Sequence, residues 1–578
     1  MQTASSLRSV SAFLLLLLAL AGPLGCGFGG GTPLEVADDT TLVIELGGEY
    51  VEAPGPNPLA RLAGDTTRPL LGLLGIFTRA ERDARVETVV LRIQPLSIGW
   101  GKADEIRAAA VRVREAGKRV VAHLEVQGFL ANKELYVASA ADEIFVAPGS
   151  AIPLVGLAAE YVHLGGLWEK FGIDFDIAKA GRYKSAIEVY AERTMSEAAR
   201  EMANSLLDDA WARFVSALAE GRHLPVTAIE DAIDRGPVRS QELEALGLID
   251  GEVHLDALLE REGGSLLYGA EYAAVDPESL GFAPQASVAL IFGVGTVLQG
   301  ESDDSPLSSE NVFASGTVSR AIVEAAEDPE IDAILLRIDS PGGSALASEI
   351  IWRAIGRARE RGTPVVVAMS DVAASGGYYV ASAANAIVAD PGTLTGSIGV
   401  FAIRPVLGGL FDKLEIGIDS LTRGKHADFL LTSEKLSPAA LARLETSVLD
   451  TYQLFLARVA DGRGLSIEAV DAVAQGRVWS GRQAFDAGLV DEVGGLYTAA
   501  RRAKVEIGLE PDDDVLLIPY PEPPTLSEQL IRALSSASVQ TLSPKIEWPE
   551  PLAQLVEVAS GLPTGTPALV PPMMIEIR

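Results

Sequence analysis

A serine between small residues is the first group in this chain that could do covalent chemistry. Ser375 stands in the stretch AASGGYY, where Gly376 and Gly377 follow it. Small neighbours leave a hydroxyl open to a substrate, and an amide beside the nucleophile is a common feature of acyl-transfer sites. A second glycine pair, Gly342 and Gly343 in DSPGGS, can leave N–H groups uncovered to hold an oxyanion or a phosphate. These residues indicate a serine nucleophile that needs a base from elsewhere in the chain.

Histidine is the usual base for a serine hydroxyl, but it is scarce here. None of the histidines stands in a recognisable pairing with an aspartate in the second half of the chain. The chain contains five of them: His123, His163, His223, His254 and His426. No GxSxG turn surrounds Ser375. The Ser-His-Asp triad is therefore not favoured, and lysine is the other side chain to consider.

The chain repeats itself, and the repeat points to a base. The stretch YVASAADEIFVAPG from Tyr136 recurs 243 residues further on as YVASAANAIVADPG from Tyr379, and 19 of the 46 positions aligned up to Gly424 are identical. Further along, GLID at Gly247 recurs as GLVD at Gly488. A match of this length indicates an internal duplication, so we expect two copies of one domain.

The two copies have lost opposite halves of a site. The position 243 residues before Ser375 is Asn132, and the position 243 residues after Lys184, in GRYKSAIEVY, is Ala427. The first copy therefore keeps a lysine and lacks the serine, whereas the second keeps the serine and lacks the lysine. Neither copy alone has both a nucleophile and a base, but the two copies together have both. We therefore expect Lys184 to be the base for Ser375.

A lysine acts as a base only when its amine is neutral. Near pH 7 this requires a pKa roughly three units below the reference value of about 10.4. Burial between two domains would disfavour the charged ammonium and lower the pKa in this direction. Ser397 in TGSIGVF is a candidate hydrogen-bond partner that would orient the amine, and its counterpart in the first copy is the apolar Leu154.

The elements that position these residues are predicted to be α/β. AILLRID and PVVVAMS are short apolar runs rich in branched residues, which is typical of buried parallel strands. The stretch between them has the apolar spacing of a helix and ends at a glycine. DSPGGS and DVAASGGY therefore follow the C-terminal ends of strands, where open α/β sheets place their ligand sites. We expect one domain over residues 40–265 and its duplicate over residues 285–510.

Composition, net charge and the sequences at the two chain ends limit the possible partners and the location of the protein. The sequence has 578 residues, of which 48% are hydrophobic and 22% charged, as in globular proteins of several domains. A net charge of −32 argues against nucleic acid as a partner. Residues 1–25 are predicted to be an export signal, and Cys26, the single cysteine, follows in a PLGC stretch that resembles a lipidation site. We expect residues 26–39 to form a tether and residues 511–578 a Pro-rich extension.

Four motifs together carry a family resemblance. DSPGGS, AASGGYY, TLTGSIGVF and GRYKSAIEVYAERTMSEAARE resemble the long, internally duplicated form of bacterial signal peptide peptidase, also called protease IV, of the Ser-Lys dyad class. The resemblance covers about residues 40–510 and implies two tandem Clp/crotonase-like domains. It also implies Ser375 as nucleophile and Lys184 as general base, with Ser397 beside the lysine amine. The oxyanion hole that it implies consists of backbone N–H groups of Gly376, Gly342 and Gly343.

The same resemblance implies a substrate and a location. Members cut leftover signal peptides and other short apolar peptides at the membrane, form a bowl-like tetramer and require no metal or nucleotide. With export and a lipid on Cys26, this chain would lie on the periplasmic side of the cell envelope. Two alternatives stay open, namely a catalytically silent scaffold that binds peptides at the envelope and a crotonase-like enzyme acting on acyl thioesters. The export signal disfavours the second, because thioester cofactors belong to the cytoplasm.

Overall fold

The described part of the chain covers both copies of the repeat. The computed structural model describes residues 35–52, 67–128, 130–302, 312–521 and 568–569. The predicted export signal, Cys26 and most of the predicted extension lie outside the described residues. Across these ranges, no helix is both long and apolar enough to cross a membrane.

The first copy of the repeat forms a six-stranded sheet in which all neighbouring strands are parallel. The strand order is β8-β6-β5-β4-β1-β9. The central strand β4 has the sequence VETVVLRIQPL, and its branched side chains are buried on both faces, as parallel sheets require. The bounds are β1 Thr40–Gly48, β4 Val86–Leu96, β5 Arg119–Leu124, β6 Glu143–Val146, β8 Gly251–Glu252 and β9 Ser265–Tyr268.

The second copy forms a matching sheet of eight strands. The order is β19-β17-β15-β13-β10-β21, with β16 paired to β15 and to β20. All these pairs are parallel except β17 with β19. Strand β21 continues this sheet beyond residue 510, because the apolar run VLLIP pairs with β10. The bounds are β10 Ala286–Val294, β13 Ala333–Ser340, β15 Val365–Ala374, β16 Ala386–Ala389, β17 Leu394–Gly396, β19 Val478–Ser480, β20 Glu492–Val493 and β21 Val515–Pro519.

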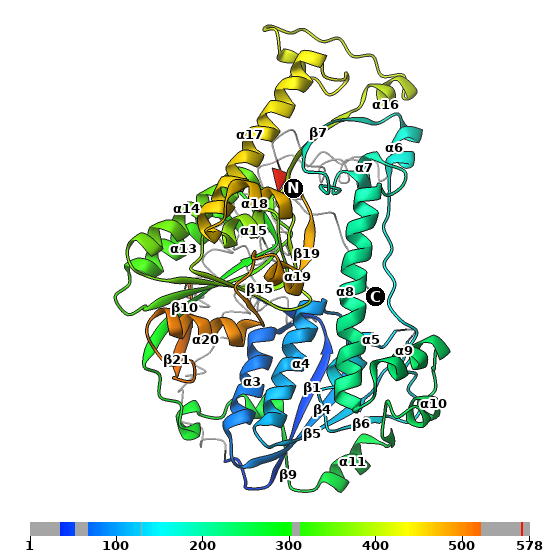
Figure 1. Ribbon diagram of the computed structural model, residues 1–578, viewed down its shortest axis with the longest axis vertical. Helices are drawn as coiled ribbons and strands as arrows, with labels where there is room; N and C mark the ends of the chain where they lie inside the picture. Colours follow the sequence, from blue (N-terminus) through cyan, green and yellow to red (C-terminus); the bar gives the residue numbers. More distant parts are fainter. Residues whose placement is uncertain (1–34, 53–66, 129, 303–311, 522–567, 570–578) are drawn as a thin grey trace, which may run out of the picture.

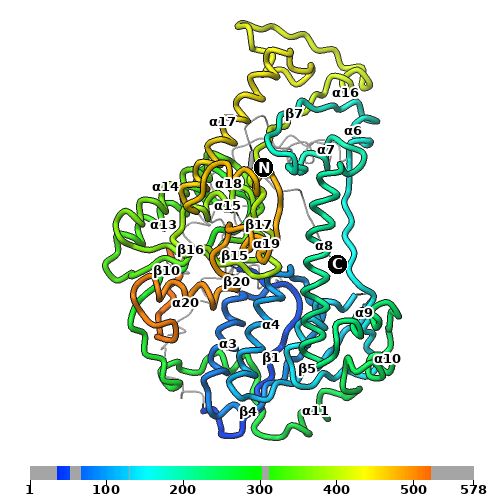
Figure 2. Tube along the Cα trace, in the orientation of Figure 1, coloured from blue at the N-terminus to red at the C-terminus, as the bar shows by residue number. Residues whose placement is uncertain are grey.

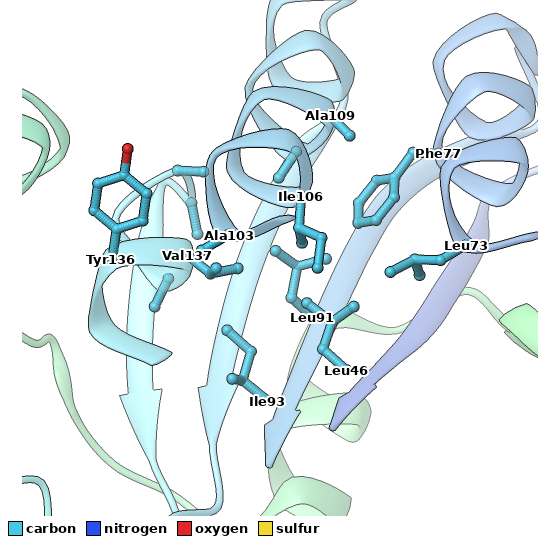
Figure 3. Close-up of a cluster of buried hydrophobic side chains, with 14 of the residues drawn as sticks. Leu46, Leu73, Phe77, Leu91, Ile93, Ala103, Ile106, Ala109, Tyr136 and Val137 are labelled. Atoms are coloured by element: carbon cyan, nitrogen blue, oxygen red, sulfur yellow. The ribbon is translucent and has the colours of Figure 1, made fainter. Parts of the chain in front are cut away.

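Helices from both copies lie between the two sheets, so the halves share one hydrophobic core. In Figures 1 and 2, α3 (Leu70–Arg82) and α4 (Trp100–Glu115) from the first half lie next to α20 (Leu496–Glu506) from the second. Figure 3 shows side chains of α3 and α4, among them Phe77 and Ile106, directed at the first sheet. Helices α13 (Ser315–Glu327) and α14 (Ala345–Glu360) pack on the second sheet and complete a buried cluster of their own. The shared core joins residues such as Val366 and Leu496 to those of the first half.

The two longest helices are duplicates of each other. Helix α8 (Glu197–Arg222) and helix α17 (Pro438–Arg463) have 26 residues each. Each begins after a serine, Ser196 or Ser437, whose hydroxyl accepts a hydrogen bond from a backbone N–H of the first turn. Each ends at a residue in the left-handed conformation. The equal lengths and equal caps agree with the duplication inferred from the sequence.

A third sheet joins the two halves and lies next to the predicted site. Its order is β12-β11-β14-β22-β18-β7, and it contains strands from both copies and from the C-terminal region. Strand β7 of the first half pairs antiparallel with β18 of the second along its whole length, from Ala180 opposite Val400 to Asp174 opposite Val406. The bounds are β7 Asp174–Ala180, β11 Thr296–Leu298, β12 Val312–Ala314, β14 Gly343–Ser344, β18 Val400–Val406 and β22 Ala568–Leu569.

The remaining elements are short and connect these layers. Strands β2 (Tyr50–Val51) and β3 (Arg68–Pro69) form a two-stranded sheet. The short helices are α5 Asn132–Ala138, α6 Gly165–Phe171, α7 Glu188–Ala191, α9 Val226–Arg235, α10 Ser240–Ala245, α11 Leu255–Glu262, α12 Gly269–Tyr272, η1 Pro277–Leu280, α15 Gly376–Ala381, α16 Gly408–Lys413, η2 Ala427–Leu430, α18 Ile467–Val473 and α19 Gly481–Asp486.

Candidate active site

Ser375 lies in a strained turn between strand β15 and helix α15. Its backbone has φ +55° and ψ −111°, which a non-glycine residue rarely adopts. The turn is held from both sides, because the Ser375 N–H donates to the Gly396 carbonyl at 2.8 Å and the Ser375 carbonyl accepts from the Tyr379 N–H at 2.8 Å. Such strain at the end of a central strand projects a side chain from the sheet, as a nucleophile requires.

The pairing of β7 with β18 brings Lys184 to this turn. Ala180, the last residue of β7, stands opposite Val400, the first residue of β18. Lys184 follows Ala180 by four residues, and Ser397 precedes Val400 by three, so the antiparallel register places them side by side. The pairing of a first-half strand with a second-half strand thus brings Lys184 of the first half next to Ser375 of the second half.

The Lys184 amine contacts both predicted partners. Its Nζ lies 2.7 Å from Ser375 Oγ, 3.0 Å from Ser397 Oγ and 3.0 Å from the Ser397 carbonyl oxygen. All three residues have a relative exposure of 0%. Because burial removes the amine from water, the pKa of Lys184 is lowered well below its ordinary value. A neutral amine accepts a proton from the serine hydroxyl, so the arrangement has the geometry and the electrostatics of a general base and a nucleophile.

Sequence reasoning missed the residue that fixes the lysine loop. A Cβ atom on Gly476 would lie 2.6 to 2.7 Å from the backbone N, Cα and Cβ of Lys184, so only glycine allows this approach. The neighbouring Gln475 carbonyl accepts a hydrogen bond from the Tyr183 N–H at 2.7 Å. A glycine pattern alone does not signal such a contact, because the partner loop is almost 300 residues away.

The glycines expected to bind an oxyanion gather beside Ser375. A Cβ atom on Gly376 would lie 3.0 Å from the Gly343 nitrogen and 3.2 Å from the Gly342 Cα, so the DSPGGS turn packs directly on the nucleophile turn. The Gly342 N–H donates to Ser340 Oγ at 3.1 Å and is therefore already engaged. Of the three glycines predicted to form an oxyanion hole, Gly342 thus has an N–H that is bonded within its own turn.

Another lysine of the first half, Lys102, forms ion pairs with residues of both turns. Lys102 Nζ donates to Asp339 Oδ2 at 2.6 Å and to Asp371 Oδ2 at 2.7 Å. Asp339 also accepts from the Val372 N–H at 3.1 Å, three residues before Ser375. Burial opposes the charge on Lys102, but the surrounding carboxylates outweigh it and raise the pKa of the amine. Lys102 is therefore a cation that ties the ends of β13 and β15 to the first half.

Next to these ion pairs lies a cluster of buried charged side chains between the halves. The Arg337 guanidinium on β13 pairs with Glu52 at 2.8 Å and with Glu105 at 2.6 Å, and Arg337 is fully buried. Burial works against ionisation of Glu52, but Arg337 and Lys102 outweigh it and lower the pKa of this carboxyl to about 2. Glu105 stands in a helical stretch, where a charged side chain is typical of a solvated face, and Arg337 stands in the apolar run AILLRID, so the sequence does not reveal that the two side chains meet.

The first-half counterpart of the site has no catalytic geometry. Asn132, at the position equivalent to Ser375, donates through Nδ2 to the Gly156 carbonyl at 3.0 Å.

A cavity of about 460 Å³ lies between the two halves. First-half residues 97–99 and Lys133 line it together with Val372 and Leu394 of the second half. Within the ranges that the structure describes, no group of three or more His, Cys, Asp or Glu side chains could hold a metal ion.

Comparison with known proteins defines the class. The model of peptidase family S49 matches residues 112–262 and 357–510, one segment in each half. The chain is 35% identical over 480 residues to the chloroplastic serine protease SPPA of Arabidopsis thaliana, covering 80% of this chain and 69% of the relative. It is 29% identical over 544 residues to Protease 4 of Haemophilus influenzae, covering 87% and 84%. A putative signal peptide peptidase SppA of Enterococcus faecium is 33% identical over 168 residues, 29% of this chain and 49% of the relative.

These likenesses and the two matching α/β halves define a serine peptidase with tandem Clp/crotonase-like domains, as the sequence predicted. The chain belongs to peptidase family S49.

Proposed function

We propose that this S49 peptidase is an endopeptidase with a Ser-Lys dyad, in which Ser375 is the nucleophile and Lys184 the general base. The observation that carries the proposal is the 2.7 Å separation of Lys184 Nζ and Ser375 Oγ in a fully buried setting. Ser397 Oγ, 3.0 Å from the same amine, orients its lone pair. The N–H groups of Gly376 and Gly343 are the proposed oxyanion donors.

The proposed reaction has two steps of the same kind, acylation of Ser375 and hydrolysis of the acyl-serine. Ser375 Oγ attacks the scissile carbonyl while its proton moves to Lys184 Nζ, and the tetrahedral oxyanion forms beside the two glycine amides. The lysine then gives this proton to the leaving amine, the C–N bond breaks and an acyl-serine remains. A water molecule repeats the sequence, with its proton passing through Lys184, and releases the new carboxylate and the free serine.

The proposed substrates are cleaved signal peptides and other short apolar peptides at the outer side of the cell membrane. The relative named as a putative signal peptide peptidase supports this substrate class. An export signal and a lipidated Cys26 would hold the enzyme at that surface, on the periplasmic side of the envelope. Membrane fractionation of the full chain and of Cys26→Ser tests the anchor, and an equal distribution of the two would contradict it.

The proposed assembly is a homo-oligomer, a tetramer by analogy with the long-form family. Residues 417–423 are the second-half counterpart of β7, yet they form no strand and lie exposed. Apolar side chains on and beside this segment face solvent: Ile416, Ile418 and Leu421 are 48%, 47% and 92% exposed. Contact with another copy would cover these exposed apolar side chains. Light scattering should give four chains for the wild type and fewer for Ile418→Asp.

Activity on a fluorogenic peptide ester tests the dyad. Ser375→Ala and Lys184→Ala should each abolish hydrolysis, with melting temperatures that show both variants to be folded. Retained activity in either variant would exclude the dyad. Covalent labelling of Ser375 by a serine-reactive probe separates the enzyme from a silent peptide-binding scaffold, which would stay unlabelled. The protease names of the relatives give no support to a thioester enzyme.

A further inference from the structure

Arg477 stands where the two segments that hold the Lys184 amine come together. It directly precedes β19, and Figure 1 shows β19 beside helix α8 of the first half. The Arg477 carbonyl accepts a hydrogen bond from the Ser397 N–H at 2.7 Å. Ser397 has φ +51°, which a non-glycine residue rarely adopts, so this bond helps to hold a strained turn. The backbone of Arg477 therefore fixes one partner of the lysine.

The side chain of Arg477 reaches the other segment. Its guanidinium lies over two aromatic rings, with Cζ 5.0 Å from the ring centre of Tyr183 and 4.4 Å from that of Trp479. Arginine stacks on aromatic faces because its planar cation is attracted to the negative face of the ring. Tyr183 directly precedes Lys184 in the sequence. The loop of Lys184 is thus in contact with the same residue that holds the Ser397 turn.

A carboxylate of the first half completes this group. Glu201 on helix α8 accepts hydrogen bonds at Oε1 from the Tyr183 hydroxyl at 2.8 Å and from Arg477 Nη1 at 3.0 Å. The hydrogen bond from Tyr183, and then that from Arg477, lower the pKa of the Glu201 carboxyl, so it stays ionised. The arginine side chain is 17% exposed and that of Glu201 46%. Arg477 is therefore shielded from most of the water that would compete for its partners.

None of the four side chains of this group recurs in the other copy of the repeat. At the repeat distances of 241 and 243 residues, the positions aligned with Arg477, Trp479, Glu201 and Tyr183 hold, in that order, Gly236, Val238, Ala442 and His426. Side chains that only support the domain fold would be expected in both copies, as the two long helices and their serine caps are. The group is thus specific to the place where the halves bring Lys184 and Ser375 together.

We propose that Arg477 is a positioning residue of the proposed dyad, which fixes the loop of Lys184 against the turn of Ser397. It does so by stacking on Tyr183 and pairing with Glu201. The inference rests on the proposed function in taking Lys184 as the general base. A misplacement of about 1 Å at a reacting group can lower the rate about 100-fold, so a contact outside the reacting atoms can control kcat.

Arg477→Gln removes the planar cation but keeps the backbone bond to Ser397. We expect kcat for a peptide ester to fall about 10- to 100-fold while KM changes less than about twofold, because the change affects the base rather than substrate binding. A looser loop lets water reach the Lys184 amine and raises its pKa toward the ordinary value. The rise of kcat/KM with pH should therefore move to higher pH by about one unit, a fraction of the about 3 to 5 units that full burial can cause.

Arg112→Gln is the matched control, because it removes the same kind of contact between the two halves. Arg112 Cζ on α4 lies 3.9 Å from the ring centre of Tyr497 on α20, and its Nε lies 3.5 Å from Glu81. Its side chain is 19% exposed, against 17% for Arg477. This variant should lose stability in urea as Arg477→Gln does, but keep kcat and the pH profile. Equal losses of kcat in the two variants, or an unchanged kcat or pH profile in Arg477→Gln, would overturn the proposal.

Coupling between the stacked side chains provides a second test. Tyr183→Leu should also lower kcat, and the double variant with Arg477→Gln should lose little more than either single variant, because both changes release the same loop. Independent losses that multiply in the double variant would contradict the shared role. If Arg477→Gln does not fold, Glu201→Ala on the exposed side of the group replaces it. We then expect kcat to fall about threefold with a shift of the profile to higher pH, and unchanged values would overturn the proposal.

The same assay separates this inference from the proposed function. Wild-type kinetics of Arg477→Gln beside an inactive Ser375→Ala would refute only the role of Arg477. Hydrolysis by Ser375→Ala would refute the proposed function itself.

Discussion

Replacing Lys184 by methionine tests the amine without changing the shape of the loop. Methionine keeps an unbranched side chain of similar length but provides no base. In the wild type the buried Nζ lies 2.7 Å from Ser375 Oγ and 3.0 Å from Ser397 Oγ. Loss of a positioned general base lowers rates by about 10²- to 10⁴-fold, so we expect kcat/KM for a peptide ester to fall within this range.

The same substitution should also change how the free energy of unfolding depends on pH. Burial lowers the pKa of Lys184 in the folded protein, whereas the unfolded chain keeps the ordinary value near 10.4. Between these two pKa values the unfolded state binds one more proton, so the free energy of unfolding of the wild type rises with pH by up to about 1.4 kcal/mol per pH unit. Lys184→Met lacks this dependence. The difference between wild type and variant should therefore grow in favour of the wild type with rising pH and level off above the ordinary lysine pKa.

Urea unfolding from about pH 6 to about pH 10.5 measures this difference, and the pH profile of kcat/KM measures the same titration. Activity of the wild type should rise as Lys184 loses its proton, at a pH well below 10.4. Lys179→Met is the matched control, because Lys179 lies on the same strand β7 and is exposed. It should change neither activity nor the pH slope. Parallel stability curves for Lys184→Met and wild type, or less than a tenfold loss of kcat/KM, would refute the reasoning.

Three further substitutions test the parts that hold the dyad. Gly476→Ala places a Cβ 2.6 Å from the backbone of Lys184 and should lower kcat about 100-fold. Gly488→Ala, also at positive φ but with nothing within 4 Å, should cost only about 1 kcal/mol of stability and no activity. Lys102→Met leaves the buried Glu52 and the partly buried Asp339 and Asp371 without their cation and should destabilise by about 3 to 5 kcal/mol in urea. Lys435→Met, in an exposed pair, should change stability by less than about 1 kcal/mol. Ser397→Ala should lower kcat more than it raises KM, because it misorients the base; an unchanged kcat would exclude that role.

The internal repeat makes the two residues of the proposed dyad recognisable in the amino-acid sequence. The glycines that follow Ser375 already suggest a nucleophile, but nothing beside Lys184 in the sequence reveals a role. The positions aligned with these two residues hold Asn132 and Ala427, and this reciprocal loss singles them out. The α/β character is recognisable for another reason, because strands such as AILLRID are buried on both faces and so are mostly apolar.

The residues that sequence reasoning missed act through contacts between distant segments. Gly476 matters because it touches the Lys184 backbone, and Lys102 because it meets Asp339 and Asp371 across the halves. Nothing in the local sequence distinguishes a glycine in a tight interface from one in a free turn. A lysine in a helical pattern likewise does not reveal that carboxylates of another half surround it.

The sequence alone predicted the duplicated α/β organisation, which the structure confirms, and the pair of side chains proposed for the chemistry, since hydrophobic pattern and residue identity are local properties. Only the tertiary structure decided how the pair meets, through the register of β7 against β18. It also decided that burial disfavours the ammonium of Lys184, and that β22 lies between β14 and β18. Desolvation and strand pairing depend on what surrounds a group in space, and those surroundings come from segments hundreds of residues apart.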